Sequence, residues 1–149
     1  MRIRAVSITA TLLLFAAAAE AHVTIQPRES KPGASETYKV RVPTEGKVAT
    51  TFVELEVPDG MVVTSVEGAT DTRDLKKSGD RIVSITWKTD IAPGTSQEFL
   101  FVATNPSTGT EIAWKAHQRY SDGTSTDWVE PAGAGSRRPG PVTKLTAAR

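Results

Sequence analysis

The sequence predicts an all-β protein, a β-sandwich of immunoglobulin-like or cupredoxin-like topology. Short runs in which apolar and polar residues alternate follow one another along the chain, and turn dipeptides separate them at short intervals. No segment shows a helical period longer than two turns. The turn dipeptides are Pro32-Gly33, Asp59-Gly60, Ser78-Gly79, Pro93-Gly94, Asn105-Pro106 and Asp122-Gly123.

Five strands are expected from these patterns. Each either has inward-facing positions at every second residue or is a short β-branched and aromatic run bounded by turns. The expected strands place Trp87 and Trp114 in the core, and they leave Glu54 and Glu56 on an outward face. The inward sets and runs are Tyr38/Val40/Val42, Val53/Leu55/Val57, Ile82–Trp87, Phe99–Ala103, and Ile112/Trp114/Ala116/Gln118/Tyr120 within Glu111–Tyr120.

Residues 1–21 are typical of a secretory signal peptide. Arg2 and Arg4 give a basic start, an apolar run follows from Ala5 to Ala18, and Ala19-Glu20-Ala21 has the small-x-small pattern of a cleavage site. Cleavage after Ala21 would leave His22 as the first residue of the mature protein, with a free α-amino group. An uncleaved signal anchor is the alternative.

Composition and charge exclude several classes of function. The chain has a formal net charge of +1, and without Arg2, Arg4 and Glu20 the remainder is neutral, whereas a nucleic-acid-binding protein needs a basic excess. The chain has no cysteine, which excludes thiolate metal sites and cysteine nucleophiles. No second apolar run is long enough to span a bilayer. We therefore expect a periplasmic or secreted protein without a membrane anchor after signal cleavage.

The segment Pro131–Pro141 is rich in Pro, Gly and Ala and contains Arg137-Arg138. It is expected to be either a long loop before a last strand at Val142–Leu145 or the start of a loose tail. The chain thus divides into a signal peptide (1–21), a β-sandwich domain (22–130), and a Pro/Gly-rich loop with a C-terminal strand or tail (131–149).

Two histidines are the first candidates for chemistry. An amino-terminal His22 can chelate a metal through its amine and its imidazole Nδ1. The alternative is that His22 is simply the first residue of an edge strand and has no function. His117 falls on the opposite face of its strand from Ile112, Trp114 and Ala116. We expect it to face solvent, and the alternative is a second imidazole ligand.

Glu45 and Trp128 are the other candidates. Glu45 follows Val42-Pro43-Thr44, where a strand ends and a loop begins, and a loop carboxylate there can reach a site at the tip of the sandwich. Asp122-Gly123 is expected to be a hairpin turn. Trp128 follows this polar turn, so we expect it to be partly buried, and the alternative is that it packs in the core or caps it.

Several fragments, taken in order, match a known family of domains. They are Ala21-His22-Val23-Thr24-Ile25-Gln26-Pro27, Val42-Pro43-Thr44-Glu45, Ala49-Thr50-Thr51, Val53-Glu54-Leu55, Phe101-Val102-Ala103, and Tyr120-Ser121-Asp122-Gly123 through Trp128. From the signal-peptide junction to about Trp128 the chain therefore resembles the YcnI-like domain of bacterial copper-handling proteins.

This resemblance implies an extracytoplasmic β-sandwich that is not an enzyme and that binds Cu(II) through a single-histidine brace. In that brace His22 would supply amine and imidazole, Glu45 would complete the site, and Trp128 would lie beside the metal. The resemblance also implies a copper carrier whose partners include other copper-transport or copper-resistance proteins.

The expected donors suit this metal, since Cu(II) prefers tetragonal nitrogen and oxygen ligands. Met61 is the only methionine beyond Met1, so the chain offers little to Cu(I), and reduction should favour release. Two other classes stay open. A copper-dependent oxidative enzyme would use His117 as a second histidine, and an interaction sandwich would bind no metal.

Overall fold

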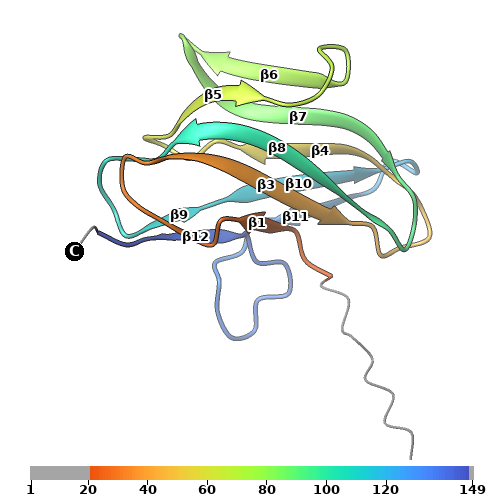
Figure 1. The fold of residues 1–149 in the computed structure, drawn as a ribbon. Helices are drawn as coiled ribbons and strands as arrows, with labels where there is room; N and C mark the ends of the chain where they lie inside the picture. The colour runs from red at the N-terminus through yellow and green to blue at the C-terminus, as the bar shows by residue number, and fades with distance from the viewer. Residues whose placement is uncertain (1–20, 148–149) are drawn as a thin grey trace, which may run out of the picture.

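The computed structural model describes residues 21–147, and all regular structure within them is β-strand (Figure 1). Two sheets pack face to face, with a third, smaller sheet beside them, so the predicted β-sandwich is confirmed. Among the described residues no helix is long and apolar enough to cross a membrane. The predicted signal peptide, apart from Ala21, lies outside them.

The first sheet has four antiparallel strands in the order β1-β3-β8-β5. Along β3 the alternation seen in the sequence becomes alternation of faces: Tyr38, Val40 and Val42 are fully buried, and the residues between them are half-buried. The strands are β1 (Thr24–Gln26), β3 (Ser35–Pro43), β8 (Ser96–Thr104) and β5 (Val62–Val66).

The second sheet has five strands in the order β11-β10-β4-β7-β6. Val53 and Leu55 of β4 face the first sheet, while Glu54 and Glu56 lie on the outward face, as the alternation predicts. The strands are β11 (Ser125–Trp128), β10 (Lys115–Tyr120), β4 (Thr50–Glu56), β7 (Arg81–Ile91) and β6 (Arg73–Ser78).

A small third sheet contains the C-terminal strand. β12 (Val142–Leu145) runs parallel to β2 (Glu29–Ser30) and antiparallel to β9 (Glu111–Ala113). Thr143 and Leu145 of β12 are buried, so this segment is a strand packed on the core and not a loose tail.

Aromatic rings fill the centre of the sandwich. Tyr38 and Phe101 are paired across β3 and β8 with ring centroids 5.3 Å apart, and Trp114 meets Tyr38 edge-on at 5.1 Å. Such pairs add roughly 0.5–1.5 kcal/mol each beyond the area they bury. Trp87 stacks on Phe99 at 4.9 Å, and both Trp87 and Trp114 are buried, as predicted.

The expected single strand Glu111–Tyr120 is wrong in one respect, because the chain changes sheets at Trp114. β9 pairs with β12, whereas β10 pairs with β4 and β11. Trp114 itself donates its backbone N–H to Pro141 O (2.9 Å) and its indole N–H to Thr143 Oγ1 (3.1 Å). Ile112, Trp114, Ala116 and Gln118 all face inward, so the period-two pattern continues through the break and hides it.

Candidate metal centre

The sequence-predicted site residues come from three distant parts of the chain that meet at one edge of the sandwich. His22 lies two residues before β1, the edge strand of the four-stranded sheet, and Trp128 ends β11, the edge strand of the five-stranded sheet. β1 pairs with β3 through Thr24 and Arg41, and extending this register places His22 opposite Pro43. Glu45 lies two residues beyond Pro43 in the β3–β4 loop, as expected.

These three residues line one cavity of about 250 Å³. His22 and Glu45 are exposed, so both remain accessible from solvent. Two larger cavities, of about 430 and 460 Å³, lie elsewhere and have no histidine in their walls. The walls of the site cavity comprise Ala21, His22, Pro43, Glu45, Gln118, Tyr120, Thr126, Trp128, Arg137 and Arg138.

Trp128 is more deeply placed than the sequence suggests. It is 7% exposed and belongs to the core, which is the alternative left open beside partial burial. Because β11 alternates like its neighbours, Trp128 stands opposite the inward-facing Ala116 of β10 and turns to the same side. Its ring meets the His22 ring edge-on, with centroids 5.5 Å apart. The indole therefore forms the inner wall of the cavity beside His22.

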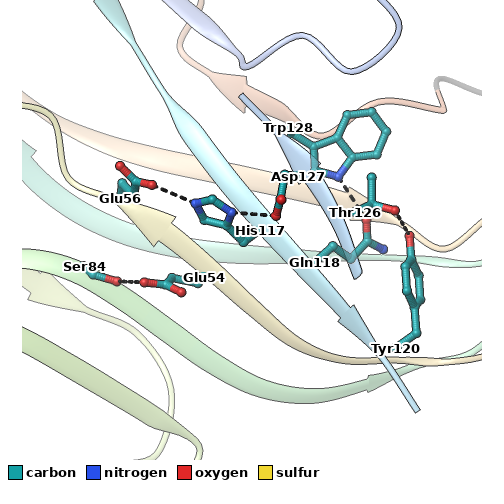
Figure 2. Close-up of polar contacts among 9 residues, drawn as sticks. All are labelled: Glu54, Glu56, Ser84, His117, Gln118, Tyr120, Thr126, Asp127 and Trp128. Atoms are coloured by element: carbon teal, nitrogen blue, oxygen red, sulfur yellow. Dashed lines mark hydrogen bonds and ion pairs between the residues drawn. The ribbon is translucent and has the colours of Figure 1, made fainter. Parts of the chain in front are cut away.

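Gln118 holds Trp128 in position, a role that its place among the inward-facing residues of the predicted strand did not reveal. It is fully buried, and its Oε1 accepts the indole N–H of Trp128 at 3.1 Å (Figure 2). Its Nε2 donates to Pro43 O (2.8 Å) and to Thr50 Oγ1 (2.6 Å), and Thr50 also bonds the hydroxyl of Thr44. One side chain thus links β11 to the end of β3, from which Glu45 follows. A polar residue in an inward-facing set was the signal that could have found it.

The β10–β11 hairpin sets the register of this wall. The Gly123 N–H donates to Tyr120 O (3.0 Å), and Gly123 has a positive φ of 83°, which glycine adopts without strain. Asp122-Gly123 is therefore a hairpin turn, as predicted. Tyr120 and Thr126, both lining the cavity, share a hydroxyl–hydroxyl hydrogen bond of 3.0 Å.

The loop between β11 and β12 (Figure 1) contributes Arg137 and Arg138 to the cavity walls. Glu130 anchors it: its backbone bonds Arg138 O and the Gly140 N–H, and its Oε2 accepts the backbone N–H of Arg137 at 2.9 Å. Gly140 passes so close to the body of the protein that a Cβ there would lie 2.2 Å from Trp114 O. Arg137 and Arg138 are thereby brought to the cavity, a placement the sequence analysis did not foresee.

His117 does not reach the cavity. It lies on the outward face of β10, as expected, but the expectation of a simply solvent-facing ring is wrong. Its Nδ1 is 2.8 Å from Asp127 Oδ1 and its Nε2 is 2.7 Å from Glu56 Oε1, so the ring joins three strands (Figure 2). Burial of the ring lowers the pKa of His117, but the hydrogen bonds and charges of Asp127 and Glu56 outweigh burial and raise it.

The donors in the cavity suit Cu(II) only if the α-amine of His22 is one of them. Within residues 21–147 no three His, Cys, Asp or Glu side chains gather closely enough to hold a metal. The cavity walls offer one imidazole and one carboxylate, from His22 and Glu45. Ala21 lies in the same walls, so cleavage before His22 would add an amine at this place. Imidazole, amine and carboxylate form the nitrogen and oxygen set that Cu(II) prefers.

Residues 22–145 match the family described as "Domain of unknown function (DUF1775)". The chain belongs to this family. The DUF1775 match runs from His22 to Leu145, the last residue of β12, and so includes every wall of the cavity except Ala21.

A DUF1775-family relative carries a more informative name. The chain is 38% identical over 147 residues to the copper-binding protein CutI of Bacillus subtilis (strain 168), covering 96% of this chain and 71% of CutI. The resemblance to the YcnI-like family is thereby confirmed. Among solved structures, an uncharacterized protein from Nocardia farcinica with an immunoglobulin-like fold matches with a TM-score of 0.72 at 30% identity, over 84% of this chain and 98% of that one.

Proposed function

We propose that this protein is exported, is cleaved after Ala21, and binds one Cu(II) at the new amino terminus. The observation that carries the proposal is the cavity whose walls contain His22, Glu45 and Trp128 together. The family match that begins at His22 and the name of CutI both support it. In this site His22 provides its α-amine and imidazole, and Glu45 provides a carboxylate.

Trp128 has the role of a wall and not of a ligand. A neutral indole can only donate its N–H, and in this protein Gln118 accepts that hydrogen. The ring lies against His22 and is buried, so it can keep water from one side of the metal and hold the imidazole in place.

The donor set suits a carrier that both loads and releases copper. The α-amine has an ordinary pKa of about 7.7–8.0 and must lose its proton to bind, so copper affinity falls as pH falls. Met61 is fully buried, and the chain has no cysteine, so no soft ligand is at hand for Cu(I). Reduction therefore favours release to a partner, such as another copper-transport or copper-resistance protein outside the cytoplasm.

A binding protein fits the site better than a copper enzyme with two histidines. His117, the other histidine, is engaged by Glu56 and Asp127 on the outward face and does not line the cavity. The relative with a functional name is called a copper-binding protein.

Single substitutions in the protein that begins at His22 test this proposal by Cu(II) titration and paramagnetic resonance. His22→Ala should abolish tight binding, and Glu45→Ala should weaken it while leaving one site per chain. His117→Ala is the matched control, because it removes the other imidazole, and it should leave the affinity nearly unchanged. If His117→Ala weakens binding as much as His22→Ala, the single-histidine site is wrong and the result favours a copper enzyme with two histidine ligands.

A further inference from the structure

The cavity that holds the proposed copper site carries more positive charge than a cation site should. Arg137 and Arg138 lie in its walls, and Glu45 is the only carboxylate there. Counting side chains alone, with His22 neutral, the walls have a formal charge of +1, and Cu(II) bound through the neutral amine would bring the total to +3. Like charges that share one cavity repel one another, and the repulsion weakens the binding of a cation there. A further negative group is needed to balance the loaded site.

The two arginines are positioned but not neutralised. The carboxylate of Glu130 accepts the backbone N–H groups of Arg137 (2.9 Å) and Arg138 (3.4 Å), which holds the loop without pairing the guanidinium groups. In the described part of the chain neither guanidinium forms an ion pair, and both residues are exposed. Arg137 and Arg138 thus line the cavity without an ion pair to neutralise them.

The proposed donors would also leave Cu(II) incompletely coordinated. The amine and imidazole of His22 and one oxygen of Glu45 would make three contacts, whereas tetragonal Cu(II) has a square of four. The cavity, at about 250 Å³, is several times the ~30 Å³ that one water occupies in the liquid, so a small molecule fits beside the ion.

We propose that the cavity binds a small oxyanion together with Cu(II), and that Arg137 and Arg138 hold it. This inference rests on the proposed copper site and names its cargo, a Cu(II) complex of a carboxylate or phosphate and not the bare ion. Guanidinium groups recognise the paired oxygens of both anions. The oxyanion takes the position on copper that the protein leaves open and offsets the charge of the arginines.

Because the two ligands share one site, each raises the affinity for the other by the same factor, and couplings of this kind are commonly about 5–150-fold. In perchlorate, which coordinates copper poorly, the double variant Arg137→Gln/Arg138→Gln should bind Cu(II) more tightly than the parent, because two positive charges are gone. Adding acetate or inorganic phosphate should tighten binding by the parent at least about fivefold relative to the double variant.

The experiment measures the Kd for Cu(II) of the protein beginning at His22, at constant ionic strength, in perchlorate, acetate and phosphate. Lys76→Gln/Lys77→Gln is the matched control: it removes the same charge from two exposed residues on β6, at the sheet edge opposite β11, and should behave as the parent does. Acetate enriched in ¹⁷O should broaden the copper resonance of the parent and not that of the arginine variant. An effect of acetate alone assigns a carboxylate, and an effect of phosphate alone assigns a phosphate.

The measurements distinguish a wrong oxyanion from a wrong copper site. If parent and arginine variant bind Cu(II) with equal affinity, and neither anion changes their ratio, the oxyanion is wrong and the copper site stands. If the lysine control shifts as much as the arginine variant, the effect is one of net charge and the oxyanion is again wrong. If the parent binds no Cu(II) in any of the three salts, the proposed function itself is contradicted.

Discussion

Gln118 offers the sharpest test of how the cavity wall is held. Replacing it by Met keeps the length of the side chain and removes all of its hydrogen bonds. Two buried groups then lose their partner, the indole N–H of Trp128 and the carbonyl of Pro43, whereas the Thr50 hydroxyl keeps its bond to Thr44. An unsatisfied buried group costs about 1–3 kcal/mol, so Gln118→Met should lower the free energy of unfolding by roughly 2–6 kcal/mol.

Urea unfolding followed by far-ultraviolet circular dichroism measures this loss, with the slope of the transition expected to stay unchanged. Gln97→Met is the matched control, because Gln97 is exposed on β8 and its bond to Thr89 is at the surface. That substitution should alter stability by no more than about 0.5 kcal/mol. The indole N–H resonance of Trp128 should also shift in Gln118→Met. A loss no larger than that of the Gln97 control would refute the role assigned to Gln118.

Three further outcomes are expected. Gly140→Ala should lower the free energy of unfolding in urea by about 1–3 kcal/mol or more, because the new Cβ would lie 2.2 Å from Trp114 O. Gly133→Ala is the control and should be neutral, because the space around Gly133 is open. Equal effects of the two substitutions would contradict the close approach at Gly140. The pKa of His117 is raised above its ordinary 6.5, so its ion pairs stabilise the parent fully below that pH and lose this effect as pH rises through the raised pKa. The parent should therefore exceed His117→Gln in stability most at low pH. A stability difference that grows with pH would contradict the raised pKa. Cu(II) should quench a smaller fraction of the fluorescence in Trp128→Phe than in the parent, and an equal fraction would place Trp128 away from the metal.

The strands were predictable because alternation along a chain directly reflects which side is buried. Tyr38, Val40 and Val42 show this plainly, since every second residue is fully buried between two sheets. The same logic could not reveal the break at Trp114, because Trp114 faces inward whether or not the strand continues. The break shows only as a change of the neighbouring strand, from β12 for β9 to β4 for β10. The local sequence pattern does not indicate which strands pair with each other.

The sequence named the three candidate ligand and wall residues one by one, but it did not indicate what surrounds them. His22, Glu45 and Trp128 come from the cleavage pattern and a family resemblance, and the fold brings all three to one cavity. The ion pairs of His117 depend on how β10 is aligned with its two neighbouring strands. Asp127 of β11 lies directly opposite His117, and Glu56 of β4 is its diagonal neighbour. The arrival of Arg137 and Arg138 depends on the path of a Pro/Gly-rich loop, which carries no periodic signal.

The central claim is that processing creates the copper site by freeing the amine of His22. The most direct measurement compares two purified proteins, one beginning at His22 and one retaining Ala21, by Cu(II) titration with paramagnetic resonance. The first should bind one Cu(II) per chain with nitrogen and oxygen ligands. The second should lose tight binding, because the nitrogen of His22 is then a peptide amide and the free amine belongs to Ala21, one residue further from the imidazole. Equal affinity and identical spectra for the two proteins would contradict the account.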